Sequence, residues 1–272
     1  MLYYEWKKTF TRRRLITIIT ILAIVSVWEV YVTEHLLSLS IEDLPDPFGQ
    51  FIGMLDYLNI LMWLILVTIV STLFTKEWDT GMAPILQTSR HGRNEVAKAK
   101  LALTLLFANT LYALYVFVML LSYYFALDMD FNIPITEGYE LELATNPGIQ
   151  TFGDIILIQT LGFFFEINFI ALVCLFLQQK LKKGFSTAVI MYIACVANLG
   201  ATFIPNLGIP IFDQIINLTP LCFTHMPITY KVLLYLGPFA VSPVHIGFVV
   251  YTVLIVLLIC FFCRQSYRFT AS

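Results

Sequence analysis

The sequence predicts an all-α integral membrane protein whose helices cross the bilayer six times. The first observation is composition: of the 272 residues, 59% are hydrophobic and 12% are charged, and the mean hydropathy is +0.81. A soluble domain carries about twice that charged fraction. The second is that apolar residues form runs of about 18 or more, the length that a helix needs to cross a bilayer. Because these runs do not alternate with polar residues, and because lipid offers the backbone no hydrogen-bond partner, we expect helices rather than barrel strands.

Six runs meet this length, and we expect residues 1–272 to form one transmembrane domain. The predicted spans are Leu15–Val32, Tyr57–Phe74, Leu101–Leu127, Ile155–Leu177, Phe185–Ile204 and Val244–Cys263. Ahead of the first span, a helix over "MLYYEWKKTFTRRR" would place Tyr3, Trp6 and Phe10 on one face. Lys7 and Lys8 would flank these aromatics. The pattern is typical of a helix that lies in the membrane interface; the alternative is an ordinary basic flank.

The basic residues fix the orientation of these spans. With six spans, the N-terminus, the segment 76–100, the segment 178–184 and the C-terminus share one side of the bilayer. That side holds 15 of the 16 lysines and arginines but only 4 of the 18 acidic residues, and Lys231 is the one exception. Cytoplasmic segments carry the excess of basic residues, so this side is predicted to be cytoplasmic and both termini with it.

The stretch 205–243 is predicted to stay on the outer side. It is apolar but carries several interruptions: Pro210, Asp213, Pro220, Pro227, Lys231 and Pro238. A seventh span here would move Arg264 and Arg268 to the outer side, against the charge distribution. We therefore expect short re-entrant or interfacial helices in this stretch.

Between the second and third predicted spans lies a charged segment, Lys76–Lys100, with the sequence "KEWDTGMAPILQTSRHGRNEVAKAK". Asp79 or Thr80 can cap a short helix there. The apolar residues after this cap fall on one helical face: Met82, Ile85 and Leu86. Such a stripe buries little area by itself, so we expect the helix to dock against another surface.

The charged segment resembles the pattern that follows the second span of type-2 ABC exporter permeases. The residues that carry the resemblance are Glu77, Gly81, Leu86, Ser89, Arg93 and Lys100. The opening "YYEWKKTFTRRRLI" is similar to the interfacial helix of those permeases, and the six-span layout matches as well, so the resemblance covers the whole chain. One departure is "QTSRHGR", where the family often has a proline before the Ser-Arg pair.

This resemblance implies the transmembrane permease subunit of an ATP-driven exporter in the cytoplasmic (inner) membrane of a bacterium. The chain has no G-x-x-x-x-G-K-[ST] sequence, so we expect no enzyme activity and no cofactor in it; a separate cytoplasmic ABC ATPase would bind ATP and Mg²⁺. A second permease copy, identical or related, would be the other partner, with no role for nucleic acid. Transport of a peptide or another amphipathic molecule is the expectation. The residues implied in coupling to the ATPase are Glu77, Gly81, Met82, Ile85, Leu86, Arg90 and Arg93.

Four residues inside the predicted spans are candidates for a translocation path: Glu166, Tyr112, Tyr115 and Phe165. A carboxyl group at bilayer depth is costly and faces the protein interior, so Glu166 either lines the path or forms a hydrogen bond to Asn168 or to a neighbouring helix. The aromatic residues either line a route for an amphipathic molecule or pack against other helices.

Two other classes of function remain open. A membrane sensor or anchor subunit could use the same docking segment without transporting anything. An intramembrane enzyme is the weaker alternative, because His35, His91, His225 and His245 are scattered and form no known catalytic motif. We therefore predict no catalytic residue and no metal site, and we interpret the Cys260-Phe-Phe-Cys263 spacing as two small apolar side chains.

Overall fold

The computed structural model describes residues 47–73, 92–127, 151–202, 234–236, 239–241 and 243–268, with scattered positions between 7 and 31 and between 216 and 219. The first predicted span, Leu15–Val32, and the interfacial helix before it lie mostly outside the described residues. The few described positions of that span are helical and exposed, Trp28 and Tyr31 among them.

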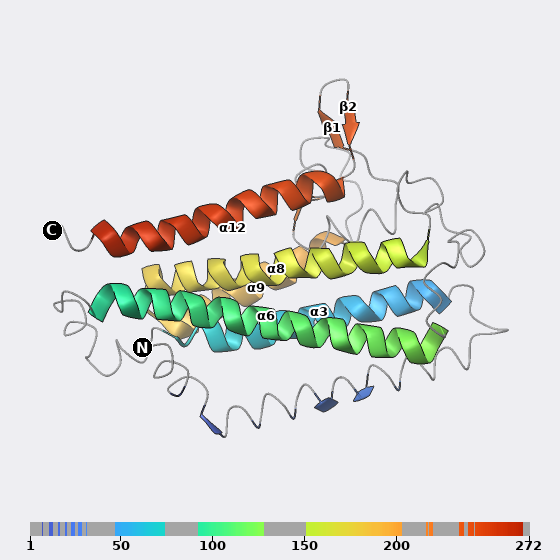
Figure 1. The fold of residues 1–272 in the computed structure, drawn as a ribbon, viewed down its shortest axis with the longest axis horizontal. Coiled ribbons are helices and arrows are strands. Elements are labelled where there is room, and N and C mark those ends of the chain that lie inside the picture. The colour runs from blue at the N-terminus through green and yellow to red at the C-terminus, as the bar shows by residue number, and fades with distance from the viewer. Residues whose placement is uncertain are drawn as a thin grey trace.

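Five long helices account for most of the described chain (Figure 1). They are α3 (Pro47–Val70), α6 (Gly92–Leu127), α8 (Phe152–Leu181), α9 (Gly184–Thr202) and α12 (Pro243–Arg268). Each coincides with a predicted span, but the ends differ. α3 begins at a proline, whose missing N–H is harmless in a first helical turn. α6 begins at Gly92 instead of Leu101, because the charged stretch ahead of the apolar run is itself rich in helix-forming alanine and lysine.

Three of these helices are long and apolar enough to cross a membrane, in the part of the chain that the structure describes. The qualifying stretches are Glu95–Leu121, Gly153–Leu181 and Val244–Arg264. Two shorter apolar stretches accompany them, Leu58–Val70 and Gly184–Asn198. The chain is therefore a membrane-embedded helical protein.

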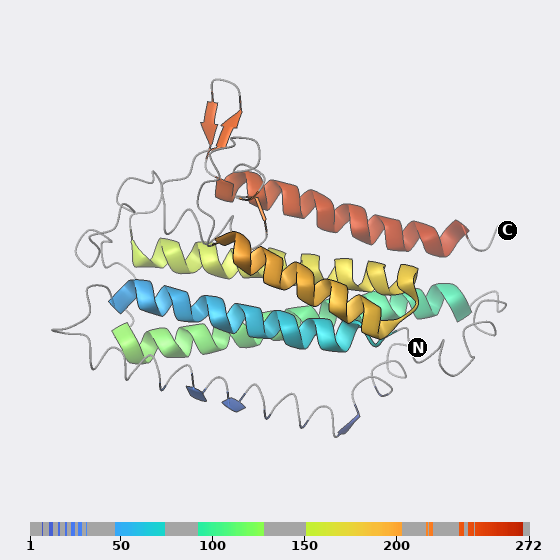
Figure 2. The ribbon, with the colours of Figure 1, turned by 180° about the vertical axis from the view of Figure 1, so that it is seen from behind.

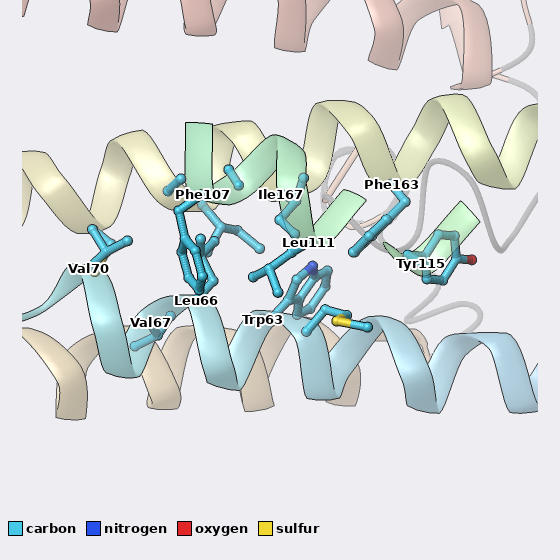
Figure 3. Packing of buried hydrophobic residues seen from close by; sticks show 14 of the residues in the cluster. Trp63, Leu66, Val67, Val70, Phe107, Leu111, Tyr115, Phe163 and Ile167 are labelled. Carbon is cyan, nitrogen blue, oxygen red and sulfur yellow. The ribbon is translucent and has the colours of Figure 1, made fainter. Parts of the chain in front are cut away.

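The helices form an antiparallel bundle in which α8 is central and contacts α3, α6, α9 and α12. Figures 1 and 2 show the bundle from its two sides, with α12 along one edge and α9 on the face opposite to α6. The core lies where α3, α6 and α8 meet. There Trp63 packs with Leu111 and Ile167, one from each helix (Figure 3). The interior of the bundle is therefore lined mainly by these three helices.

The outer faces of α9 and α12 are apolar and exposed. The large exposed side chains on these two helices include Phe185, Val189, Ile193, Val196, Val249, Val253, Val256 and Leu257. In a soluble protein such a surface would be unusual, but in a bilayer it meets the lipid tails.

Two short strands pair near the end of the stretch 205–243, which corrects the expectation of short helices for these residues. Strands β1 (Leu234–Leu236) and β2 (Phe239–Val241) pair antiparallel, with Leu234 opposite Val241 and Leu236 opposite Phe239. The sequence between the strands is Gly-Pro, a pair that favours turns, and the strands are rich in aromatic and aliphatic residues that suit a pleated surface. The helical prediction was wrong here because an apolar run this short is compatible with either structure.

Local signals fix both ends of α8. At its start, Thr151 and Asp154 form a capping box: the Thr151 N–H donates to Asp154 Oδ2 at 2.9 Å, and the Asp154 N–H donates to Thr151 Oγ1 at 3.3 Å. At its end, Lys182 takes a left-handed conformation with φ of 57°, and its N–H donates to the Gln178 carbonyl at 2.9 Å. This tight end lets α9 begin at Gly184 and run back beside α8.

Candidate functional site

Glu166 lies midway along α8 and points into the bundle, with none of its surface exposed. Its Oε2 accepts a hydrogen bond from Asn59 Nδ2 on α3 at 2.9 Å. The inward orientation agrees with the expectation from the cost of a carboxyl group in lipid. The partner is on a neighbouring helix, so the hydrogen bond joins α8 to α3 near the middle of α8.

Asn168 makes a second polar bridge, on another face of α8. Its Nδ2 donates to the Phe164 carbonyl at 2.8 Å, while its Oδ1 accepts from Asn109 Nδ2 on α6 at 3.3 Å. Two residues along a helix differ in direction by about 200°. Glu166 and Asn168 therefore connect α8 to different neighbours, α3 and α6.

Several other polar groups in this interior have no hydrogen-bond partner among the residues that the structure describes. They are Asn59 Oδ1, Trp63 Nε1, Thr104 Oγ1 and both amide atoms of Gln159, and all are buried. Buried polar groups are normally paired, with protein or with ordered water. The space between α3, α6 and α8 thus offers donors and acceptors to water or to a polar ligand.

The aromatic candidates lie on two different seams of the bundle. Tyr115 is buried against Phe163, with ring centroids 4.1 Å apart. Tyr112 is half-buried and meets Phe164 edge-on at 5.3 Å. Phe165 faces α12 instead, where its ring lies 5.3 Å from that of Phe248. The structure therefore brings Glu166 into the α3–α6–α8 interior, places Tyr115 in its core, and puts Phe165 on the α8–α12 seam.

The five helices carry all of their basic residues to one end of the bundle, which we call the basic end. These residues are Arg93, Lys98 and Lys100 near the start of α6, Lys180 near the end of α8, and Arg264 and Arg268 near the end of α12; Lys182 and Lys183, in the turn between α8 and α9, lie at the same end. α3 also ends here (Figure 1). Lys180 is held in place by two rings, with its Nζ 5.8 Å from the centre of Phe176 and 6.0 Å from that of Phe261.

At the basic end, two buried side chains bind carbonyl groups of the turn that directly follows α3. Lys100 Nζ donates to the Leu73 carbonyl at 2.8 Å, and Gln178 Nε2 donates to the Ser71 carbonyl at 2.6 Å. Sequence analysis noted Lys100 only within the family pattern and did not identify Gln178. A signal was present for Lys100: it follows Val96 by four residues and precedes Leu103 and Phe107, so it lies on the apolar face of α6, whereas Lys98 does not.

The residues implied in ATPase coupling lie almost wholly outside the described residues: Glu77, Gly81, Met82, Ile85, Leu86 and Arg90. Arg93 is in the first turn of α6. The described ends of the chain on either side of this segment, Leu73 and Gly92, both belong to the basic end. Comparison of the chain with models of known families, with curated proteins and with solved structures finds no match.

Proposed function

We propose that the chain is the permease subunit of an ATP-driven exporter in a bacterial cytoplasmic membrane. In this proposal it crosses the membrane six times, with both termini in the cytoplasm, and pairs with a second permease copy, identical or related. A separate ABC ATPase docks on the segment Lys76–Lys100.

The observation that supports the proposal is that the two helices flanking this charged segment, α3 and α6, meet at the basic end. α3 ends and α6 begins at the basic end, and the Lys100–Leu73 hydrogen bond joins α6 to the turn that follows α3. Basic residues collect on the cytoplasmic side of membrane proteins. A charged segment of this length, held at that end between two apolar helices, is suited to binding a cytoplasmic protein.

In the proposed mechanism the ATPase grips the stripe of Met82, Ile85 and Leu86, with Glu77, Arg90 and Arg93 as polar contacts beside it. ATP supplies the free energy in that partner, which would also hold the Mg²⁺. Movement of the segment displaces α3 and α6 relative to α8, since the segment connects α3 to α6. The bundle would then alternate between states that open to either side of the membrane.

Polar groups in the α3–α6–α8 interior support an export path through this chain. Asn59 Oδ1 and both amide atoms of Gln159 are buried and have no hydrogen-bond partner among the described residues, and Glu166 lies at the level of Asn59, to which it is hydrogen-bonded. They could bind the polar part of a peptide or another amphipathic molecule when the helices separate. Tyr112, Tyr115 and Phe165 would contact its apolar part.

A non-transporting sensor or anchor subunit coupled to an ATPase is the second candidate. It is favoured by the filled core of the bundle, in which the fully buried Trp63 and Phe163 occupy the space where a path would run. Substrate-stimulated ATP hydrolysis together with flux into vesicles separates the two candidates, because a sensor would show no flux.

Co-purification tests the proposed function. The tagged chain is expressed in its native host, solubilised gently and compared with a variant in which Met82, Ile85 and Leu86 are all replaced by aspartate. We expect the unaltered chain to recover a soluble protein that carries the G-x-x-x-x-G-K-[ST] sequence, and we expect the variant to lose it. A matched control replaces Val253, Val256 and Leu257 of α12 by serine and should retain the ATPase. Equal recovery by all three chains, or no such protein with any, would contradict the proposal.

A further inference from the structure

The backbone winds more tightly at the end of α3, and side chains of two other helices then bind it. After Val70 the Ser71 N–H still donates to the Val67 carbonyl, whereas Thr72 and Leu73 donate to carbonyls only three residues back, at 3.1 Å each. The final carbonyl groups of a helix have no partner within it. Here the Ser71 and Leu73 carbonyls accept hydrogen bonds from Gln178 on α8 and from Lys100 on α6.

Both donors are wholly buried, and this makes the anchor specific. Lys100 and Gln178 have no exposed surface, and Ser71 is 2% exposed. A cation beside a helix C-terminus meets the negative end of the helix dipole. Replacing Lys100 by a hydrocarbon side chain would leave the Leu73 carbonyl without this donor in a site closed to water.

The anchor also stands at a particular place in the chain. Leu73 is the last described residue before the charged segment, and Lys100 is its final residue, so the hydrogen bond joins positions 27 residues apart at the base of that segment. Gln178 fixes the same end of α3 to α8, the helix that contacts all the others.

We propose that Lys100 is a positioning residue: it ties the turn after α3 to α6 at the base of the charged segment, so that α3 and α6 respond to the segment as one body. This inference deepens the proposed function and rests on it for the role of Lys100 in coupling. The hydrogen bond between Lys100 and Leu73 itself does not depend on an ATPase.

Limited proteolysis of the purified chain tests the tie without any ATPase. An arginine-specific protease reports on the segment through cleavage at Arg90 and Arg93, and on the rest of the basic end through cleavage at Arg264 and Arg268. We expect Lys100→Met to speed cleavage at the first two sites by about tenfold, because local opening no longer breaks a charge-assisted hydrogen bond. Cleavage at Arg264 should be unchanged.

The matched control is Lys98→Met, two residues away on the exposed face of α6, which should leave every rate within about twofold of wild type. If Lys100→Met does not fold, Gln178→Met takes its place: it removes the Ser71 contact, keeps the buried cation, and should speed cleavage at Arg90 and Arg93 by about threefold.

Two results would overturn the inference: unchanged cleavage at Arg90 and Arg93 in a folded Lys100→Met protein, or acceleration that is equal at Arg264, which would indicate general loss of stability. Failure of the co-purification experiment with the unaltered chain would instead contradict the proposed function. The proteolysis result would still test whether Lys100 joins α6 to the end of α3.

Discussion

At the scale of single residues, the pairing of Glu166 with Asn59 determines how α3 and α8 face each other. Both side chains are buried, and the 2.9 Å hydrogen bond spans positions far apart in the sequence. A one-turn slip of either helix would separate them. The pair therefore specifies the register of two apolar helices that lipid alone would let slide.

Replacing both members of this pair should cost less than the sum of the two single replacements. We expect Glu166→Leu to lower the free energy of unfolding by about 1–2 kcal/mol, because Asn59 Nδ2 loses its acceptor in a dry site. Glu166→Gln keeps an acceptor and should change the stability by less than about 0.5 kcal/mol. Thermal unfolding in detergent micelles measures both.

The double variant Asn59→Leu/Glu166→Leu completes the cycle. Its loss in free energy of unfolding should be smaller than the sum of the losses of the two single variants by about 1 kcal/mol. Strict additivity would show that the pair does not couple the helices.

Trp63 combines a large buried ring with an indole N–H that has no hydrogen-bond partner in the described part of the chain. Trp63→Ala should destabilise the bundle by about 3–5 kcal/mol, because it leaves a cavity between three helices. Trp63→Phe should cost only about 1 kcal/mol, since the loss of volume is offset by removal of an unpaired donor. The same thermal unfolding assay compares them, and equal losses for Phe and Ala would show that the N–H has a partner after all.

At the scale of elements, α8 is the helix around which the bundle is organised, and its start is set by Thr151. Removing the cap with Thr151→Ala should lower stability by about 1 kcal/mol. Thr252→Ala is the control, because Thr252 is exposed on α12 and bonds only to the carbonyl of Phe248 in its own helix; its effect should stay within about 0.5 kcal/mol. If both alanine variants melt alike, the capping box does not set the start of α8.

The helices were predictable from the sequence because hydropathy alone locates long apolar runs, and five of the predicted spans coincide with described helices. The early start of α6 at Gly92 was not predictable in this way. Its first turns are charged, and the apolar run that marks the predicted span begins only at Leu101. The hairpin at 234–241 was missed for the opposite reason: its residues are apolar, and a run that short does not distinguish strand from helix.

The site was predictable only in part. The inward direction of Glu166 followed from the cost of a carboxyl group in lipid. Its partner did not, because the rotation of α3 against α8 decides which residue meets it. The contacts of Lys100 and Gln178 with the end of α3 were likewise beyond reach, since each joins positions that only the packed bundle brings together.

At the scale of the whole molecule, the antiparallel order of the helices gathers every basic residue of the five described helices at one end. This is a consequence of chain order: α3, α8 and α12 end where α6 and α9 begin. The proposed six-span arrangement adds a first helix before α3 and places this end in the cytoplasm.

Cysteine labelling in intact cells tests that arrangement. In a chain whose natural cysteines are replaced by alanine, a membrane-impermeant maleimide should label Asp43→Cys, in the predicted first outer loop, and should leave Lys183→Cys unlabelled until the membrane is permeabilised. Equal labelling of both positions in intact cells would mean an even number of spans between them, and labelling of Lys183→Cys alone would mean a reversed orientation.

Photo-crosslinking from the charged segment most directly tests the central claim that this segment binds an ATPase. A photoreactive amino acid is placed at Ile85, and in a control chain at Val253 on the exposed face of α12, and both are irradiated in native membranes. The account predicts an adduct from Ile85 with a protein that carries the G-x-x-x-x-G-K-[ST] sequence, and lipid adducts alone from Val253. Adducts from Ile85 with lipid only, or with no protein of that kind, would contradict it.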